Sequence, residues 1–463
     1  MKKSLLILMT LCTAVIGYSQ TFVENYITYQ VTSTTANTVY ASDYDANGGA
    51  VVNIPATVLY NGTTYSVTLI GSNAFQNKGL TSVNMSNNIT SIYPSAFRDN
   101  VLTSLTLSDN VTFIGASAFY NNQLNTVIIP NNVTNIATST FSNNQLTHVI
   151  IPDNVTSIDQ NAFQGNQLQS VTIGNSVTSI GNQAFLNNAL INLIIPNNVT
   201  SIGTNAFAVN QLTSVTLSSN VTIIAEQAFR NNQLTSIIIP NNVISIGDNA
   251  FKDNLLTSVT IPNNVTSIGG NAFYNNDLTS LVIGENVTTI GILAFGLNNL
   301  TAITLPSSVT NIAALAFGFN PSLVGITSLA STPPTVATGG SSDTFGNYSL
   351  RSNMDLHIPP GTLGAYVTDA GALWTGFNTV TEDALSVSDF ELTNEVIIIN
   401  TNDELKIISS GSAKLNNYAI YNMSGAKVKE GTESNVTIDA LSSGIYILEL
   451  IFDKGRLVKK FAK

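Results

Sequence analysis

A phenylalanine recurs every 22 residues over more than half of this chain, and no insertion or deletion breaks the register. The twelve phenylalanines are Phe75, Phe97, Phe119, Phe141, Phe163, Phe185, Phe207, Phe229, Phe251, Phe273, Phe295 and Phe317. A fixed period of this length is typical of repeat proteins, in which each repeat is one small structural unit. We therefore expect a solenoid of about twelve coils over residues 70–320.

One unit shows how a coil is built. Val259 and Ile261 alternate with Thr260, which is the pattern of a half-buried strand, and the Pro-Asn pair that follows ends the strand. The segment around Phe273 is too short for a real helix, so we expect a single turn or a 3₁₀ piece there. Because 22 residues cannot bury their own apolar side chains, stacked coils must bury them together, each strand adding to a parallel sheet along the array. The predicted fold class is mainly β.

An asparagine lies three residues after the phenylalanine in eleven of the twelve units, from Asn100 to Asn320, and Lys78 is the exception. Buried turns leave backbone groups that need hydrogen-bond partners, and an amide side chain both donates and accepts. We predict that these asparagines form a structural ladder between coils.

The repeated pattern LxxVxIPxxVxxIGxxAFxxN, from about Ile54 to Val380, resembles the BspA-like leucine-rich-repeat family of bacterial surface proteins. The resemblance implies a curved solenoid with adhesive or ligand-binding roles, and it implies no catalytic residues. Members of the family often have a cysteine near the position that asparagine takes in this chain.

The segments on either side of the array do not follow the period. Residues 20–69 contain FVENYITYQV and NTVYASDY, which predict two strands of a hairpin cap over the first coil, since an open sheet edge invites aggregation. Residues 321–383 are predicted to form the C-terminal cap of the array, with Trp374 packed inside it.

The higher density of charged residues in residues 384–463 predicts a separate domain there. They contain 9 basic and 10 acidic residues, whereas the much longer stretch from Phe75 to Asn320 contains 4 and 9. Short alternating runs such as YAIYNM and NVTIDA predict an antiparallel β-sandwich. With the opening LSVSDFEL, the strand LSSGIYILEL and the ending LVKKFAK, this tail is similar to the C-terminal sorting domain of the Bacteroidetes type IX (Por) secretion system, although INTNDELKI replaces its usual Pro-Asn-Pro motif. The resemblance implies recognition by the type IX machinery and removal of the tail at the cell surface.

The N-terminus has the pattern of a secretory signal, residues 1–19. Lys2 and Lys3 precede a short apolar stretch, and Ser19 marks a cleavage site before Gln20. The stretch is too short for a membrane span, and no later segment is apolar enough for one. The only cysteine, Cys12, lies within it, so the mature chain has no disulfide and no thiolate site. We predict a secreted or outer-surface protein.

Composition and motifs argue against several function classes. The formal net charge of -11 disfavours nucleic acid as a partner, which requires a basic surface. His148 lies on a repeat strand and His357 in the C-terminal cap, so neither a catalytic triad nor a zinc site can be assembled from them. The carboxylates of the array are scattered, although two of them could in principle approach as a glycosidase pair. We predict no enzyme activity, no metal and no cofactor.

Two local motifs have simpler explanations than the ones they first suggest. Asp43, Asp45, Asn47 and Gly48 match the opening of a calcium loop, but Ile54 takes the place of the glutamate at the twelfth position, so we interpret the motif as a turn. The Asn-Val-Thr triplets match glycosylation sequons only because the repeat reproduces them.

An uncharged stripe is expected on the exposed face of the repeat strands, nine residues after each phenylalanine. Its central members are Ile128, Ile150, Thr172, Ile194, Thr216, Ile238 and Thr260. β-Branched residues suit any pleated surface, but a long apolar stripe is also typical of interaction sites. The leading hypothesis is an adhesion protein that binds a protein or glycan. The alternatives are a passive spacer or matrix component, which the monotony of the array favours, and binding to an ordered surface such as ice or crystalline polysaccharide.

Overall fold

The computed structural model describes residues 20–346, 348–383, 396–400, 404–409, 414–422, 426–442, 444–452 and 455–463. The predicted signal segment and the LSVSDFEL segment lie outside the described residues. The chain divides into two compact units. The first runs to Val221 and includes Ala228–Gln233, and the second comprises Thr222–Gln227 and the chain from Leu234 onward.

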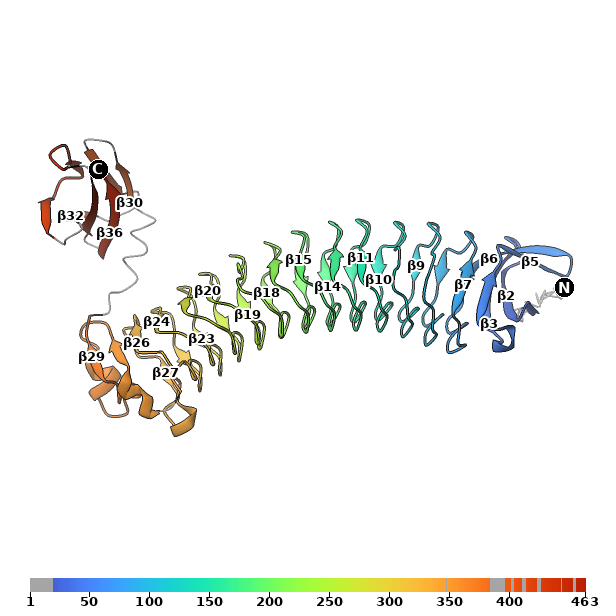
Figure 1. Cartoon of the computed structure of the whole chain (residues 1–463), viewed down its shortest axis with the longest axis horizontal. Coiled ribbons are helices and arrows are strands. Elements are labelled where there is room, and N and C mark those ends of the chain that lie inside the picture. Colours follow the sequence, from blue (N-terminus) through green and yellow to red (C-terminus); the bar gives the residue numbers. More distant parts are fainter. Residues whose placement is uncertain are drawn as a thin grey trace, which may run out of the picture. The chain divides into compact units, whose positions relative to one another are not determined.

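The longest parallel ladders run through the Ser-Ile pair of each coil, directly after the Asn-Val-Thr triplet (Figure 1). In the first unit the ladder is β10 (Asn135–Ile136), β12 (Ser157–Ile158), β14 (Ser179–Ile180) and β16 (Ser201–Ile202). In the second unit it is β18 (Ile223–Ile224), β19 (Ser245–Ile246), β21 (Ser267–Ile268), β23 (Thr289–Ile290), β25 (Asn311–Ile312) and β27 (Thr335–Val336). The second residue of each strand is buried, isoleucine in all of them except β27, which has Val336, and the residue before it is exposed or half-buried.

The strands predicted from the Val-Thr-Ile pattern form on the opposite side of the coil, but from β11 to β22 they pair only two coils at a time. The pairs are β11 (His148–Ile150) with β13 (Ser170–Thr172), β15 (Asn192–Ile194) with β17 (Ser214–Thr216), and β20 (Ser258–Thr260) with β22 (Ser280–Val282). The prediction of one uninterrupted sheet at this position is therefore wrong, and the ladders through the two-residue strands on the other side of the coil were not predicted.

Proline explains where the strand pairing stops. The second strand of each pair is followed, two residues on, by Gly174, Ser218 or Gly284, whereas the first strand of the next pair is followed by a proline such as Pro196. In the first coil, the backbone N–H of Ser86 at this position donates to the Ile54 carbonyl at 3.2 Å. Proline has no N–H to donate, so the coil that carries it does not pair backward.

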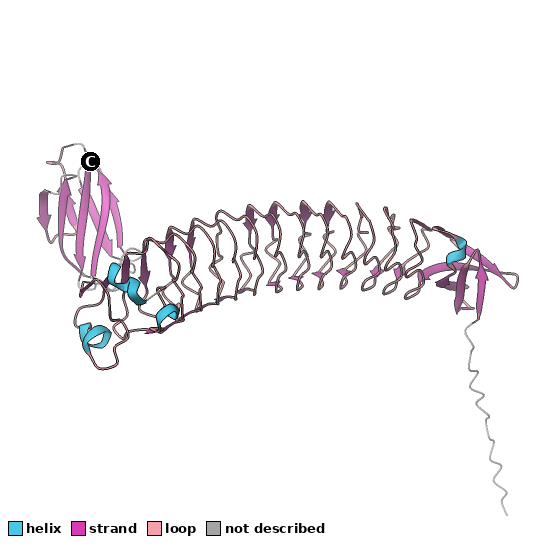
Figure 2. Cartoon of the chain, turned by 60° about the horizontal axis from the view of Figure 1, so that its bottom comes forward, coloured by secondary structure: helices cyan, strands magenta, loops and turns pink. Residues whose placement is uncertain are grey.

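The phenylalanines that recur every 22 residues fill the centre of the coils as a stack of parallel rings. Ring centroids are 5.1–5.7 Å apart from Phe75 to Phe229 in the first unit. In the second unit they are 5.3–5.6 Å apart from Phe251 to Phe317, and Phe345 of the cap continues the stack at 6.2 Å. The segment around each phenylalanine is a hydrogen-bonded turn, so the turn alternative is the correct one. In the described chain, helical turns lie only in the segments beside the array (Figure 2).

The N-terminal segment covers the first coil with an antiparallel arrangement, as predicted. Its strands β1 (Thr21–Glu24), β2 (Ile27–Ser33) and β3 (Thr38–Tyr44) form a meander. Strand β3 runs parallel to β6 (Thr63–Ile70), which continues into the coil strands β8 (Ser91–Ile92) and β9 (Phe113–Ile114). The remaining strands are β5 (Thr57–Tyr60), which forms a hairpin with β6, and β4 (Val51–Ile54), which pairs in parallel with β7 (Ser82–Met85).

The C-terminal segment of the array continues the parallel stacking at irregular intervals. Strands β24 (Ala302–Leu305), β26 (Gly325–Ser328), β28 (Asp355–His357) and β29 (Thr379–Thr381) pair in this order. The helical turns are η1 (Ala46–Gly48), near the N-terminus, and η2 (Gly340–Ser342), η3 (Tyr348–Asn353) and η4 (Gly364–Thr368) here. Trp374 is fully buried in this segment, as predicted, and its Nε1 donates to the Pro334 carbonyl at 2.8 Å.

The tail forms two antiparallel sheets, as the alternating runs predicted. One contains β30 (Val396–Asn400), β31 (Glu404–Ser409) and β34 (Asn435–Thr437). The other contains β33 (Lys427–Gly431), β32 (Leu415–Asn422), β35 (Ile445–Phe452) and β36 (Gly455–Ala462). A core that includes Leu405, Ile420 and Leu448, each fully buried, is shared by strands of both sheets. Among the described residues, no helix has the length and apolar character needed to cross a membrane.

Candidate binding surface

All members of the predicted stripe are exposed in the structure. Ile128, Ile150, Thr172, Ile194 and Thr216 belong to the first unit, and Ile238 and Thr260 to the second. Ile128 and Ile238 are 82% and 86% exposed, and Ile150 and Ile194 are 65% and 71% exposed. Their neighbours in the strand, such as Val149 and Leu193, point inward and are buried. The inward and outward assignment of the strand is thus confirmed, whereas contact of the stripe with a ligand stays a prediction.

Within the first unit, the stripe is interrupted by a cleft between β13 and β15. The cleft has a volume of about 390 Å³, and its walls include Thr172, Asn192, Ile194 and Pro196. Val171 of β13 is half-buried at its side, whereas its partner Val149 in β11 is buried. The cleft occurs where the proline of the second coil prevents backward pairing, so the exposed face is stepped and not flat.

The Asn-Val-Thr triplet has a structural role that the sequence analysis missed. Asn154 Nδ2 donates to the Asn131 carbonyl of the preceding coil at 2.6 Å, and Thr156 Oγ1 donates to the Thr134 carbonyl at 3.1 Å. Val155, between them, is fully buried. This triplet therefore joins its coil to the previous one at two exposed points and adds one side chain to the core, and the triplet of Asn198 and Thr200 makes the same two bonds.

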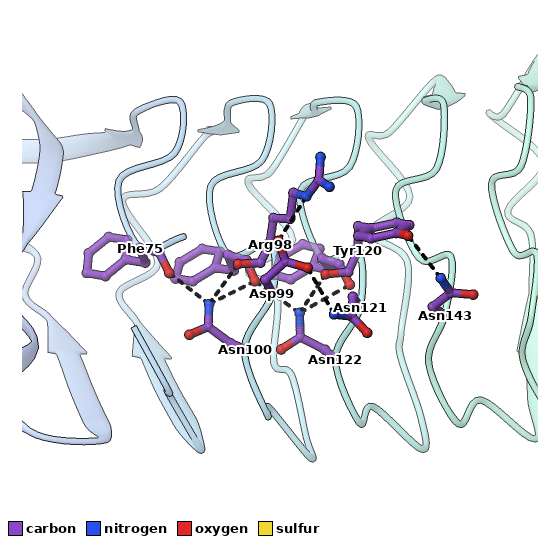
Figure 3. A network of polar contacts seen from close by, with 10 residues as sticks. Phe75, Arg98, Asp99, Asn100, Tyr120, Asn121, Asn122 and Asn143 are labelled. Carbon is purple, nitrogen blue, oxygen red and sulfur yellow. Dashed lines mark hydrogen bonds and ion pairs between the residues drawn. The ribbon is translucent and has the colours of Figure 1, made fainter. Parts of the chain in front are cut away.

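The asparagine ladder predicted from the repeat is present (Figure 3). Asn122 Nδ2 donates to the carbonyl of Phe97 in the preceding coil at 3.0 Å and to that of Phe119 in its own coil at 3.3 Å. Its Oδ1 accepts from the backbone N–H of Leu102 at 3.1 Å. One side chain thus provides partners for buried backbone groups of two coils, and the same geometry recurs along each unit.

The residues considered for metal or acid–base chemistry are engaged in local contacts. His148 lies exposed on β11, and His357 on β28 lies 2.7 Å from Asp383, where the hydrogen bond lowers the pKa of that carboxyl group. The DxDxNG motif is a turn, since Asp45 accepts from the Asn47 N–H at 2.9 Å and Asp43 pairs with Lys78 at 3.0 Å. In the part of the chain that the structure describes, no three potential metal ligands gather.

Comparison with known families decides the identity of the repeat. The model of the BspA type Leucine rich repeat region matches in six copies over residues 63–147, 135–254 and 222–332, which together span more than half of the chain. The chain belongs to the BspA-type leucine-rich-repeat family. This BspA-type chain also matches the Secretion system C-terminal sorting domain over residues 396–463, which indicates a secreted or outer-surface protein. Both resemblances inferred from the sequence are confirmed.

The chain is also similar to several solved structures. A leucine rich cell surface protein from Faecalibacterium prausnitzii is 26% identical, with 76% of this chain and 98% of that chain covered and a TM-score of 0.49. The pneumococcal vaccine antigen PcpA is 16% identical, with 79% and 99% covered and a TM-score of 0.46. A leucine-rich repeat protein from Bacteroides ovatus is 23% identical, with 78% and 100% covered and a TM-score of 0.38. Among proteins with curated descriptions, none matches.

Proposed function

We propose that this BspA-type protein is an adhesion protein that binds an extracellular protein or glycan through the strand-face stripe. The observation that carries the proposal is a row of uncharged β-branched side chains, of which Ile128, Ile150 and Ile194 in the first unit are each at least 65% exposed. Large apolar side chains that repeat along one face in this way are uncommon on a soluble surface unless they contact a partner.

The regular spacing of the stripe favours many weak contacts over one strong site. Within each strand pair, the two coils present equivalent side chains about 4.8 Å apart. Contacts repeated along such a row add through avidity. Because the stripe contains no charged side chain, its binding is expected to depend little on salt concentration. The type IX machinery would be a second partner, through the sorting domain.

We assign the array no catalytic role and no cofactor. Its carboxylates are scattered, and His148 and His357 lie on different elements, β11 and β28, with no shared site. A passive spacer is the second candidate function. The near-identity of successive coils favours it, because a specific ligand usually requires unlike residues at equivalent positions.

The test begins with the secreted chain on an array of glycans and extracellular-matrix proteins. Binding to any ligand found should fall at least tenfold in the triple variant Ile128→Lys, Ile150→Lys and Ile194→Lys, a loss of about 1.4 kcal/mol. Folding should survive, because all three side chains point to solvent. The matched control is Gln123→Lys, Gln145→Lys and Gln167→Lys.

The control adds the same charge to the same unit at exposed positions away from the stripe. Equal losses in both triple variants, or unchanged binding by a folded stripe variant, would contradict the strand-face site. If the screen of glycans and extracellular-matrix proteins finds no ligand, the spacer function is favoured instead.

A further inference from the structure

Every coil contains two residues in the left-handed backbone region, two positions before and two positions after its phenylalanine. Nineteen of these 24 positions carry asparagine, serine, aspartate, glutamine or glycine. Asparagine, aspartate and glycine are the residues that accept this conformation most easily, whereas an ordinary side chain there costs about 1–2 kcal/mol. The repeat thus shows which residues the turn prefers.

The last two coils depart from this preference. Leu293, Leu297, Leu315 and Phe319 occupy the four left-handed positions, with φ angles of 55°, 54°, 56° and 60°. The only other apolar side chain at such a position in the twelve coils is Val209, which stands alone. Bulky residues in the left-handed region are strained, and strained backbone conformations tend to cluster at functional sites.

The residue directly after the phenylalanine changes in the same coils. Most earlier coils carry a long side chain at this position, and two of these lie over the ring of the next coil, Arg98 over Tyr120 at 4.8 Å and Lys252 over Tyr274 at 5.3 Å. Gly296, Gly318 and Gly346 take this position in the last two coils and in the cap. A Cβ on Gly296 would lie 2.9 Å from the Leu293 side chain, so the absence of a side chain at Gly296 leaves room for Leu293.

An apolar pocket of about 550 Å³ lies at the start of the C-terminal segment, and Leu297, Phe319 and Gly346 are among its lining residues. Its walls include Leu297, Phe319, Pro321, Phe345 and Leu350. Phe319, Leu350 and Leu297 are 56%, 46% and 41% exposed, so these side chains remain available at the surface.

Polar groups at the pocket are few. Asn320 uses its amide in the ladder, because it donates to the Phe295 and Phe317 carbonyls and accepts from the Leu300 N–H. The Ser341 hydroxyl is the other polar side chain among the described lining residues. None of those lining residues is charged.

We propose that this pocket binds a neutral, ring-containing small molecule whose single polar group hydrogen-bonds to Ser341. The volume falls in the range typical of small-molecule sites, about 300–1,000 Å³, and such sites are mostly apolar with a few polar groups. A charged ligand would lose its hydration here without gaining an opposite charge. This site is independent of the strand-face stripe, so either can fail without the other.

The probes are benzyl alcohol, benzoate and benzylammonium, which share a ring and differ in charge. Titration of the full chain, followed by ligand-observed nuclear magnetic resonance, should show binding of benzyl alcohol at least tenfold tighter than of either ion. Ser341→Ala should remove the preference for benzyl alcohol over toluene. The double variant Leu297→Asn and Phe319→Asn should lose at least tenfold in affinity for benzyl alcohol.

The double variant should also keep or raise the Tm, because asparagine suits the left-handed conformation better than leucine or phenylalanine does. Val209→Asn is the matched control, since it relieves the same strain in another coil and should leave probe binding unchanged. Equal binding of all three probes, no binding up to their solubility limits, or unaltered binding by the double variant would overturn the proposal. A large fall in Tm of the double variant would overturn it too, because Leu297 and Phe319 would then serve packing and not a ligand.

Discussion

At the scale of single residues, the asparagine three positions after each phenylalanine joins neighbouring coils through buried polar contacts. Asn144 donates to the Phe119 carbonyl at 2.9 Å and to the Phe141 carbonyl at 3.2 Å, and it accepts from the Leu124 N–H at 3.0 Å. Buried backbone groups of this kind destabilise a fold when they lose their partners. The first coil has Lys78 in place of this asparagine. The backbone N–H of Lys78 donates to Asn100 Oδ1 of the next coil.

Asn144→Ala should lower the free energy of unfolding by about 3 kcal/mol, since it leaves buried donors and acceptors of two coils unpaired. Asn154→Ala removes an exposed bond of the same type, to Asn131, and should cost about 0.5–1 kcal/mol because water can replace it. Urea denaturation of the two variants makes the comparison. Equal losses would argue that burial does not distinguish the two ladders.

Phe185 lies fully buried between Phe163 and Phe207, at centroid distances of 5.4 and 5.3 Å. Phe185→Ala should therefore cost about 3–5 kcal/mol. Thr216→Ala, on the exposed strand face, should cost far less. Because coupling in a repeat protein acts mainly between neighbours, hydrogen exchange should locate the damage in the coils around Phe185. Indistinguishable exchange in the two variants would count against this core assignment.

At the scale of elements, strand pairing on the stripe side is decided by the residue that follows the strand. Gly174 allows β13 to approach β11 closely, because a Cβ there would lie 2.4 Å from the Pro152 carbonyl oxygen. At the equivalent position after β17, Ser218 carries a side chain, and its hydroxyl donates to the Val199 carbonyl of the preceding coil at 2.6 Å. Proline at this position has no N–H, so a coil that carries it does not pair with the coil before it.

Gly174→Ala should separate β11 from β13 and destabilise the first unit, because backbone atoms surround the site and cannot rotate away. A loss of about 1–3 kcal/mol is expected, as for other overpacked sites. Exchange of the Ile151 amide, which donates to the Thr172 carbonyl at 2.8 Å, should accelerate. Gly339→Ala is the control, since nothing lies within 4 Å of its Cβ position. Full protection of Ile151 in the Gly174 variant would refute the close-approach explanation.

At the scale of the whole molecule, a repeat array and a sorting domain are joined in one exported chain. The sorting domain matches residues 396–463, and the array family matches residues 63–332. The two parts serve different ends, since one addresses the chain to the outer surface and the other presents a long surface there. The predicted signal segment fits the same route.

Protein recovered from the medium or the cell surface should begin near Gln20 and lack roughly the last eighty residues. The expectation follows from the predicted signal segment and from removal of the sorting domain at the surface. Intact-mass measurement distinguishes the full chain from forms shortened at either end. Recovery of only the unprocessed chain, inside the cell, would rule out export by this route.

The sequence by itself determined the period, the fold class, the buried phenylalanines, the asparagine ladder and the exposed stripe. These features are repeated twelve times, and a side chain that recurs in register must meet its equivalents in neighbouring coils whatever the details of the turn. The antiparallel tail and the packing of Trp374 could also be predicted, because alternation and apolar bulk are local properties of the chain.

Only the tertiary structure decided which coils pair on the stripe side, what the Asn-Val-Thr triplet does and where the apolar pocket lies. Pairing depends on how closely two backbones approach, which is a property of the space between coils and not of one coil's pattern. The pocket requires Gly346 and Leu350, outside the periodic array, to lie beside Leu297 and Phe319. The repeat pattern of the sequence shows what equivalent positions of the coils have in common. It does not predict contacts between the array and segments outside it, such as those that form the pocket.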